Sequence, residues 1–134
     1  MAVDSIAVTN GSDIDETHHN NLRKDFLLGK SIGGTETDGA TITIDWSDLS
    51  KGKTRKVTLG GNRALVFSNA VADQWIILDI IQDATGGRTI TSWPSGKWPG
   101  GSAIDLTSDA NAIDTIAIHY TGTTYHYYPV QGLA

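Results

Sequence analysis

The chain has 134 residues, of which 39% are hydrophobic and 19% charged, so it suits one domain with a buried core and argues against wholesale disorder. Its net charge of −5 is opposite to the basic surface that non-specific nucleic-acid binding needs, and we expect no nucleic-acid partner. The absence of Cys excludes disulfides and thiolate metal sites. No apolar stretch approaches the roughly 20 residues that cross a bilayer, so we expect no membrane partner.

Residues 1–39 are predicted to form an N-terminal arm, one short helix and a connector. Asp13 is placed as the helix N-cap, Glu16 follows three residues later, and Gly29 is a plausible stop. Apolar side chains then share one face of about four helical turns, which cannot bury that face alone. We therefore assign self-association or capsid contact to the residues of this stripe: Ile14, His18, Leu22, Phe26 and Leu27.

Residues 40–134 are predicted to form a β-domain, because the apolar period changes from helical spacing to two. Ile42, Ile44 and Trp46 point one way, and the nearly continuous apolar run at 75–81 predicts a central strand. Polar and glycine-rich turns separate the predicted strands, which lie near residues 41–46, 54–59, 63–67, 75–81, 88–93, 104–107, 112–120 and 123–128. About eight short strands predict an all-β fold, a jelly-roll-like β-sandwich or a barrel.

The stretch 82–101 is interpreted as a hairpin that turns at residues 84–87 and continues into a loop with two Trp-Pro pairs. Two interpretations of the aromatic residues stay open. In the first, Trp46, Trp75 and Trp93 fill the core and the tyrosines cover strand edges. In the second, exposed rings stack on sugars, and the possible ligand contacts are Trp98, Tyr125 and Tyr127.

Histidines offer two candidate chemical sites. His18 and His19 are neighbours, and their rings diverge by about 100° on a helix, so one chain cannot easily chelate one ion with both. His119 and His126, with Asp114 nearby, could be imagined as an acid–base site. Their strand positions alternate with core residues, so we expect both rings to face solvent.

Aspartates offer a third candidate. Two of Asp45, Asp79 and Asp83 could be read as a carboxylate pair for glycoside hydrolysis, but isolated aspartates at strand ends are usually turn or surface residues. The sequence also has no dinucleotide-binding, phosphate-loop, serine-hydrolase or zinc-protease motif. We therefore expect no enzyme, no catalytic residues, no cofactor and no metal.

Several stretches of the β-domain resemble a β-domain of tailed-bacteriophage virion structural proteins, which occurs in tail-fibre-like and virion-decoration proteins. The resemblance covers about residues 40–128, and residues 17–27 resemble a short helical segment that precedes such domains. The family often ends in Gly-Gly-x-x-Trp-Tyr, whereas residues 121–127 lack that Trp. The stretches that carry the resemblance are 40–45, 57–65, 82–90, 93–101 and 110–114.

This resemblance implies a virion structural role without enzyme activity. Since the chain is too short for a fibre shaft, we expect a capsid decoration (cement) protein, a homotrimer that bridges and stabilises subunits of the major capsid protein. It would be synthesised in the host cytoplasm and lie on the capsid surface. The alternative is a receptor- or carbohydrate-binding module of a tail or head fibre, with a tail or baseplate protein as its partner.

Overall fold

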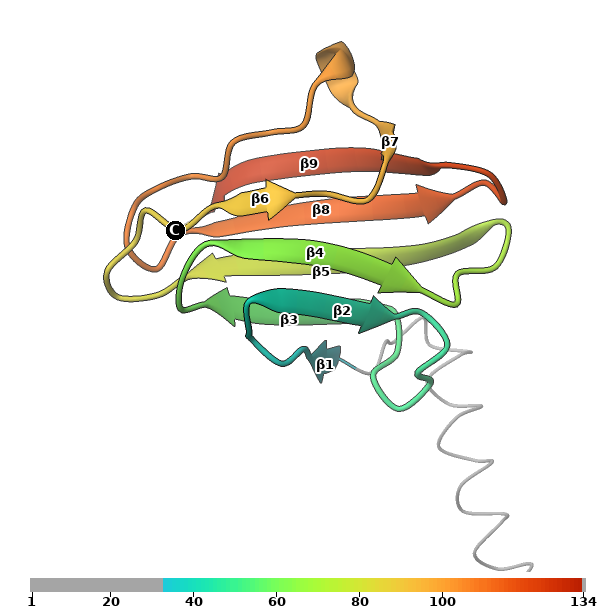
Figure 1. Ribbon diagram of the computed structural model, residues 1–134, viewed down its shortest axis with the longest axis horizontal. Helices are drawn as coiled ribbons and strands as arrows, with labels where there is room; N and C mark the ends of the chain where they lie inside the picture. The colour runs from blue at the N-terminus through green and yellow to red at the C-terminus, as the bar shows by residue number, and fades with distance from the viewer. Residues whose placement is uncertain (1–32, 134) are drawn as a thin grey trace, which may run out of the picture. The chain divides into compact units, whose positions relative to one another are not determined.

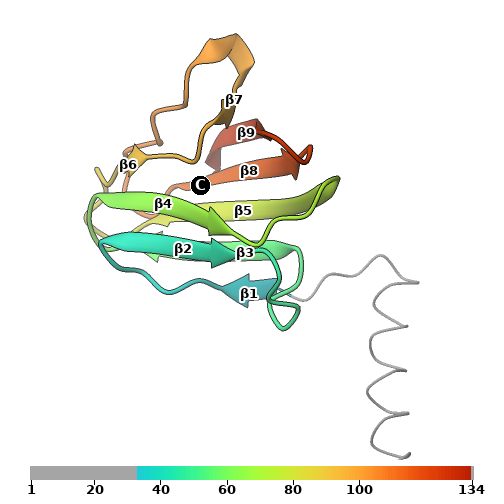
Figure 2. The same ribbon diagram turned by 45° about the vertical axis from the view of Figure 1, so that its right-hand side comes forward.

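Residues 33–133 are described by a computed structural model, and they fold into two β-sheets that face each other (Figures 1 and 2). The predicted helix lies outside the described residues, as do Ile14, His18, Leu22, Phe26 and Leu27. Their assignment to self-association or capsid contact therefore stays a prediction. No helix within residues 33–133 is long and apolar enough to span a membrane.

The larger sheet has six strands and the smaller has three. In spatial order the larger sheet contains β1 (Gly33–Thr35), β3 (Thr54–Leu59), β5 (Gln74–Gln82), β8 (Ile113–Tyr120), β9 (Tyr125–Leu133) and β7 (Gly96–Lys97). The smaller contains β2 (Thr41–Asp45), β4 (Arg63–Ser68) and β6 (Ile90–Ser92), and a 3₁₀ turn, η2 (Pro99–Gly101), follows β7. The prediction of an all-β, sandwich-like fold is confirmed.

The first six strands alternate between the two sheets, so the chain winds as a coil. Successive turns of the coil pair in parallel: Gly33 lies opposite Thr54, and Thr54 lies opposite Ile77. Only β5–β8 and β8–β9 are antiparallel pairs in the described part. Because a jelly roll is built from antiparallel strands, the jelly-roll part of the prediction is not confirmed. The alternation of apolar residues predicts which face of a strand is buried, but it does not predict which strand pairs with it.

The core lies between the two sheets, where the period-two pattern points apolar side chains inward. The predicted inward set is confirmed, since Ile42 and Ile44 on β2 and Trp46 directly after it are almost fully buried. Strands β3, β5 and β8 supply the facing layer. The other buried hydrophobic residues of this core are Val57, Leu59, Leu65, Ile76, Leu78, Ile80, Ile116, Ile118 and Tyr127.

Two sequence interpretations need correction. The stretch at 82–90 is not a hairpin, because β6 pairs in parallel with β4 in the smaller sheet, and the turn carries the chain from one sheet to the other. Gly86 has a positive φ of 75° there, and a Cβ would lie 2.5 Å from the Ser108 carbonyl oxygen, so glycine is required. The segment 104–107, predicted as a strand, forms none, although Ile104 and Leu106 pack against the core.

The β-domain begins earlier than residue 40. Strand β1 lies in the predicted connector, and Glu36 directly after it is buried against Arg55 with an Nη1–Oε2 distance of 2.8 Å. Arg55 also donates to the carbonyl oxygens of Gly52, Asp45 and Asp48, so its guanidinium is satisfied on several sides. This polar network joins β1 to β3 and to the turn that follows β2.

Candidate functional site

Aromatic side chains gather on the outer face of the larger sheet, away from the core. Trp75 on β5 is 44% exposed and Tyr128 on β9 is 49% exposed. The Trp75 ring stacks on His119, with ring centroids 4.6 Å apart, and on Tyr128, with centroids 5.7 Å apart. The interpretation of Trp75 as a core residue is wrong, because the strand alternation that buries Ile76 turns Trp75 outward. We call Trp75, His119 and Tyr128 the outer aromatic row.

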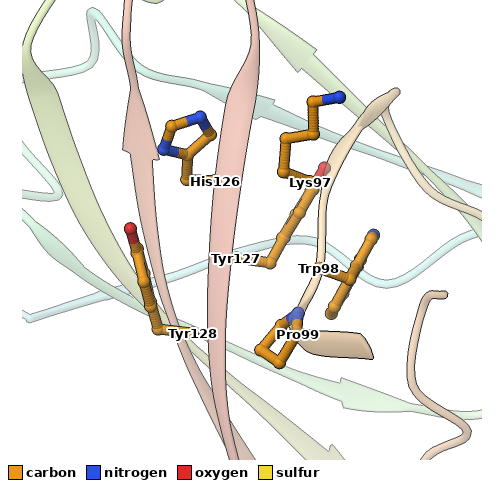
Figure 3. Close-up of a pocket in the computed structure, with 6 residues that line it drawn as sticks. All are labelled: Lys97, Trp98, Pro99, His126, Tyr127 and Tyr128. Atoms are coloured by element: carbon orange, nitrogen blue, oxygen red, sulfur yellow. The ribbon is translucent and has the colours of Figure 1, made fainter. Parts of the chain in front are cut away.

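A shallow pocket adjoins this row at the edge of the sheet, where β7 pairs with β9. Its volume is about 220 Å³, a size that suits one sugar ring better than a drug-sized ligand. Tyr128 belongs to both the row and the pocket, so the two features are continuous. We call it the β7–β9 pocket, and its lining residues are Lys97, Trp98, Pro99, His126, Tyr127 and Tyr128 (Figure 3).

The inner wall of the pocket is a stacked aromatic pair. The ring centroids of Trp98 and Tyr127 lie 4.0 Å apart, and the rings are inclined by only 4°. Figure 3 draws the two side chains side by side. Tyr127 is nearly fully buried, and its hydroxyl donates to the Pro94 carbonyl oxygen at 2.6 Å. Burial raises the pKa of Tyr127 well above its ordinary value, so this side chain remains a neutral donor. Trp93 packs edge-on against both rings, with centroid distances of 4.9 Å to Trp98 and 5.9 Å to Tyr127, so it supports the stacked pair from beside it.

The short strand β7 positions this wall. Gly96 lies opposite Tyr125 and Lys97 lies opposite His126 in a parallel pair. Pro99 then prevents further strand pairing, because proline has no N–H to donate, and the chain leaves the sheet through η2. The two Trp-Pro pairs therefore bracket the strand and hold Trp98 over Tyr127.

Gly96 is required for this close pairing. A Cβ at this position would overlap the Tyr125 carbonyl oxygen and come within 2.6 Å of Tyr127 Cε2. We therefore expect Gly96→Ala to lower the free energy of unfolding by about 1–3 kcal/mol and to distort the pocket. Thermal melting checks this, with Gly33→Ala as the control, since a Cβ there meets nothing within 4 Å. Equal melting temperatures for the two variants would contradict the assignment.

The structure separates the three predicted ligand contacts. Trp98 and Tyr127 come together in the β7–β9 pocket, but Tyr125 points into the core and packs on Phe67 and Trp46. The loop that holds Trp98 was expected to expose the ring, whereas Trp98 is half-buried on Tyr127. Sequence reasoning missed Lys97 and Pro99, considered His126 only for acid–base chemistry, and did not choose Tyr128 among the three ligand contacts. The available signal for His126 and Tyr128 was strand alternation, because the neighbours of an inward-pointing Tyr127 must point outward.

The histidine candidates do not form an acid–base pair with Asp114. His119 and His126 lie on the outer face, as predicted, with ring centroids 5.9 Å apart. Asp114 is buried, and it accepts hydrogen bonds from the Thr107 amide and hydroxyl and from the Gly132 amide. The three hydrogen bonds that Asp114 accepts tie the 104–107 segment to the end of β9, which is a structural role.

The aspartate candidates also have separate structural partners. A hydrogen bond from the Ser47 hydroxyl, aided by Asn69, lowers the pKa of Asp45 to about 2. Asp79 accepts a hydrogen bond from the Thr115 hydroxyl at 2.7 Å. Asp83 pairs with Arg88, whose hydrogen bond lowers the pKa of that carboxyl. Each carboxylate serves its own turn or strand pair.

Comparison with known proteins places the chain in a family. A family model described as "Putative phage tail fibre C-terminal domain" matches residues 7–125. Neither the search of curated proteins nor that of solved structures found a match. The family match covers most of the described domain, including β7, Trp98 and the first residue of β9.

Proposed function

The chain belongs to the family of phage tail fibre C-terminal domains, and on this premise we propose that it is a carbohydrate-binding module that contacts a glycan of the host surface. Membership makes it a structural component of a phage virion. The finer proposal concerns the ligand and the site, and it contains no catalytic step.

One observation carries the proposal: the β7–β9 pocket and the outer aromatic row form a continuous, partly exposed aromatic surface. Sugars present apolar C–H faces to aromatic rings and hydroxyls to polar groups, so such a surface suits them. Tyr128 is the shared ring, with Trp75 on one side and the pocket on the other. A glycan of several sugar units could extend from the pocket toward Trp75.

The capsid decoration reading is a second candidate, with the major capsid protein as the partner. Its main support is that the chain is too short for a fibre shaft, but a match to the C-terminal domain of a tail fibre removes the need for a shaft in this segment.

We retain a homotrimer as part of the proposal, since closed symmetry is the rule for assemblies of identical chains. Gold-labelled antibody on intact virions distinguishes a tail location from a capsid location.

We expect Trp98→Ala and Tyr128→Ala to weaken glycan binding at least about tenfold, because loss of a central aromatic contact costs about 1.4 kcal/mol or more. Binding is measured on an array of bacterial surface oligosaccharides and then by titration calorimetry. Val66→Ala is the control, since Val66 is also exposed but lies on the smaller sheet. Unchanged binding by Tyr128→Ala, whose ring is outside the core, would remove the pocket from the proposal.

A further inference from the structure

We propose that the β7–β9 pocket selects acidic sugars, meaning sugar units that carry a carboxylate or a phosphate group. The inference rests on the proposed carbohydrate-binding function and names the class of ligand for that site. It starts from the two basic side chains of the pocket, which the aromatic contacts alone do not explain.

Lys97 and His126 are direct partners in the register of the parallel pair β7–β9. Neighbouring strands lie about 4.8 Å apart, so two side chains at paired positions emerge side by side on one face of the sheet. Both are drawn in the upper part of Figure 3, above the Trp98–Tyr127 stack. An anionic group that enters this end of the pocket can therefore contact both side chains.

The charge around these two residues favours an anion. Of the described residues that line the pocket, two are basic and none is acidic. Most basic side chains of the domain are already neutralised by carboxylates, as in the pairs of Arg55, Arg63 and Arg88. Lys97 has no such ion pair within residues 33–133. Its charge is available to a ligand.

The charge distribution along the site also gives the ligand a direction. Trp75, His119, His126 and Lys97 are successive register partners across β5, β8, β9 and β7. His119 Nε2 lies 3.6 Å from the exposed carboxylate of Asp73, which directly precedes β5. The acidic group therefore lies toward β5, and Lys97 lies at the opposite, β7 end. An acidic sugar therefore fits with its charged group at Lys97 and His126 and its ring against Tyr128. Since the whole chain carries a charge of −5, this local basic site is what admits an anion.

The experiment compares neutral, carboxylated and phosphorylated bacterial oligosaccharides on an array, with the full chain as the probe. The best-bound carboxylated member is also tested after its carboxylates have been reduced to alcohols. We expect at least about tenfold tighter binding of the acidic form than of the reduced form, because a hydrogen bond to a charged group contributes that much. Added salt should weaken binding of the acidic form and leave binding of the reduced form nearly unchanged.

Two lysine variants test whether the preference for acidic sugars arises at the β7–β9 pocket. Lys97→Met should lower the affinity for the acidic form about tenfold and should lower the affinity for the reduced form much less. Lys56→Met removes the same charge from β3, which three strands separate from β7, and should change the affinity for neither form. Equal binding of acidic and neutral members would overturn the inference and leave the carbohydrate function standing. No binding to any member would overturn both. Binding confined to phosphorylated members would support the inference and identify the anion.

Discussion

Replacing Arg55 by methionine is expected to lower the free energy of unfolding by about 3–5 kcal/mol. The change leaves the carboxylate of Glu36 buried without its closest partner, and solvent cannot reach it. Lys51 Nζ stays 3.0 Å from the other carboxylate oxygen, but this side chain is partly exposed and compensates only in part. Urea denaturation followed by tryptophan fluorescence measures the loss.

The double variant Glu36→Leu with Arg55→Met is the matched control. It removes both charges, so it should recover much of the lost stability, since apolar residues can replace a buried pair at little cost. Arg88→Gln breaks a half-exposed pair with Asp83 and should change stability far less, because water screens that pair. A loss below about 1 kcal/mol for Arg55→Met alone would contradict a structural role for the pair.

The second large effect is expected at Trp46, where substitution by alanine should cost about 3–5 kcal/mol. Trp46 is 2% exposed and packs on Phe67 and Tyr125, so its removal leaves a cavity between the sheets. Trp75→Ala is the informative comparison, since that ring is 44% exposed. Trp75→Ala should lower the free energy of unfolding by less than about 1 kcal/mol and weaken glycan binding instead.

Trp46→Phe should retain more stability than Trp46→Ala. The indole N–H of Trp46 has no hydrogen-bond partner among the described residues, so phenylalanine loses no such bond and keeps most of the apolar volume. Chemical denaturation of the three variants checks the order. If Trp75→Ala were as destabilising as Trp46→Ala, the outward placement of Trp75 would be wrong.

The inward faces of the strands could be predicted from the sequence, whereas the pairing of the strands could not. Ile42, Ile44 and Trp46 follow directly from period-two alternation. The same alternation cannot distinguish a hairpin from a turn between two sheets, and Gly86 satisfies both readings. The apolar run 75–81 predicted a buried strand on both faces, but the outer face of β5 remains partly exposed at Trp75 and Ile77.

The candidate site was only partly visible in the sequence. Trp98 and Tyr127 were singled out as aromatics, but their stacking depends on the pairing of β7 with β9 across a separation of about thirty residues. Lys97 and His126 carry no sequence motif, and only the parallel register makes them neighbours. Tyr125 was included because it is aromatic, and its inward position follows from the burial of Tyr127 two residues later.

Competition for phage adsorption tests the central claim most directly. Purified protein is added in excess to host cells before the phage, and the fraction of phage that adsorbs is counted. If the chain is a glycan-binding tail fibre module, the wild-type protein lowers adsorption and Tyr128→Ala does not. Undiminished adsorption at saturating protein, together with antibody labelling of the phage head, would contradict the account and favour the capsid decoration role.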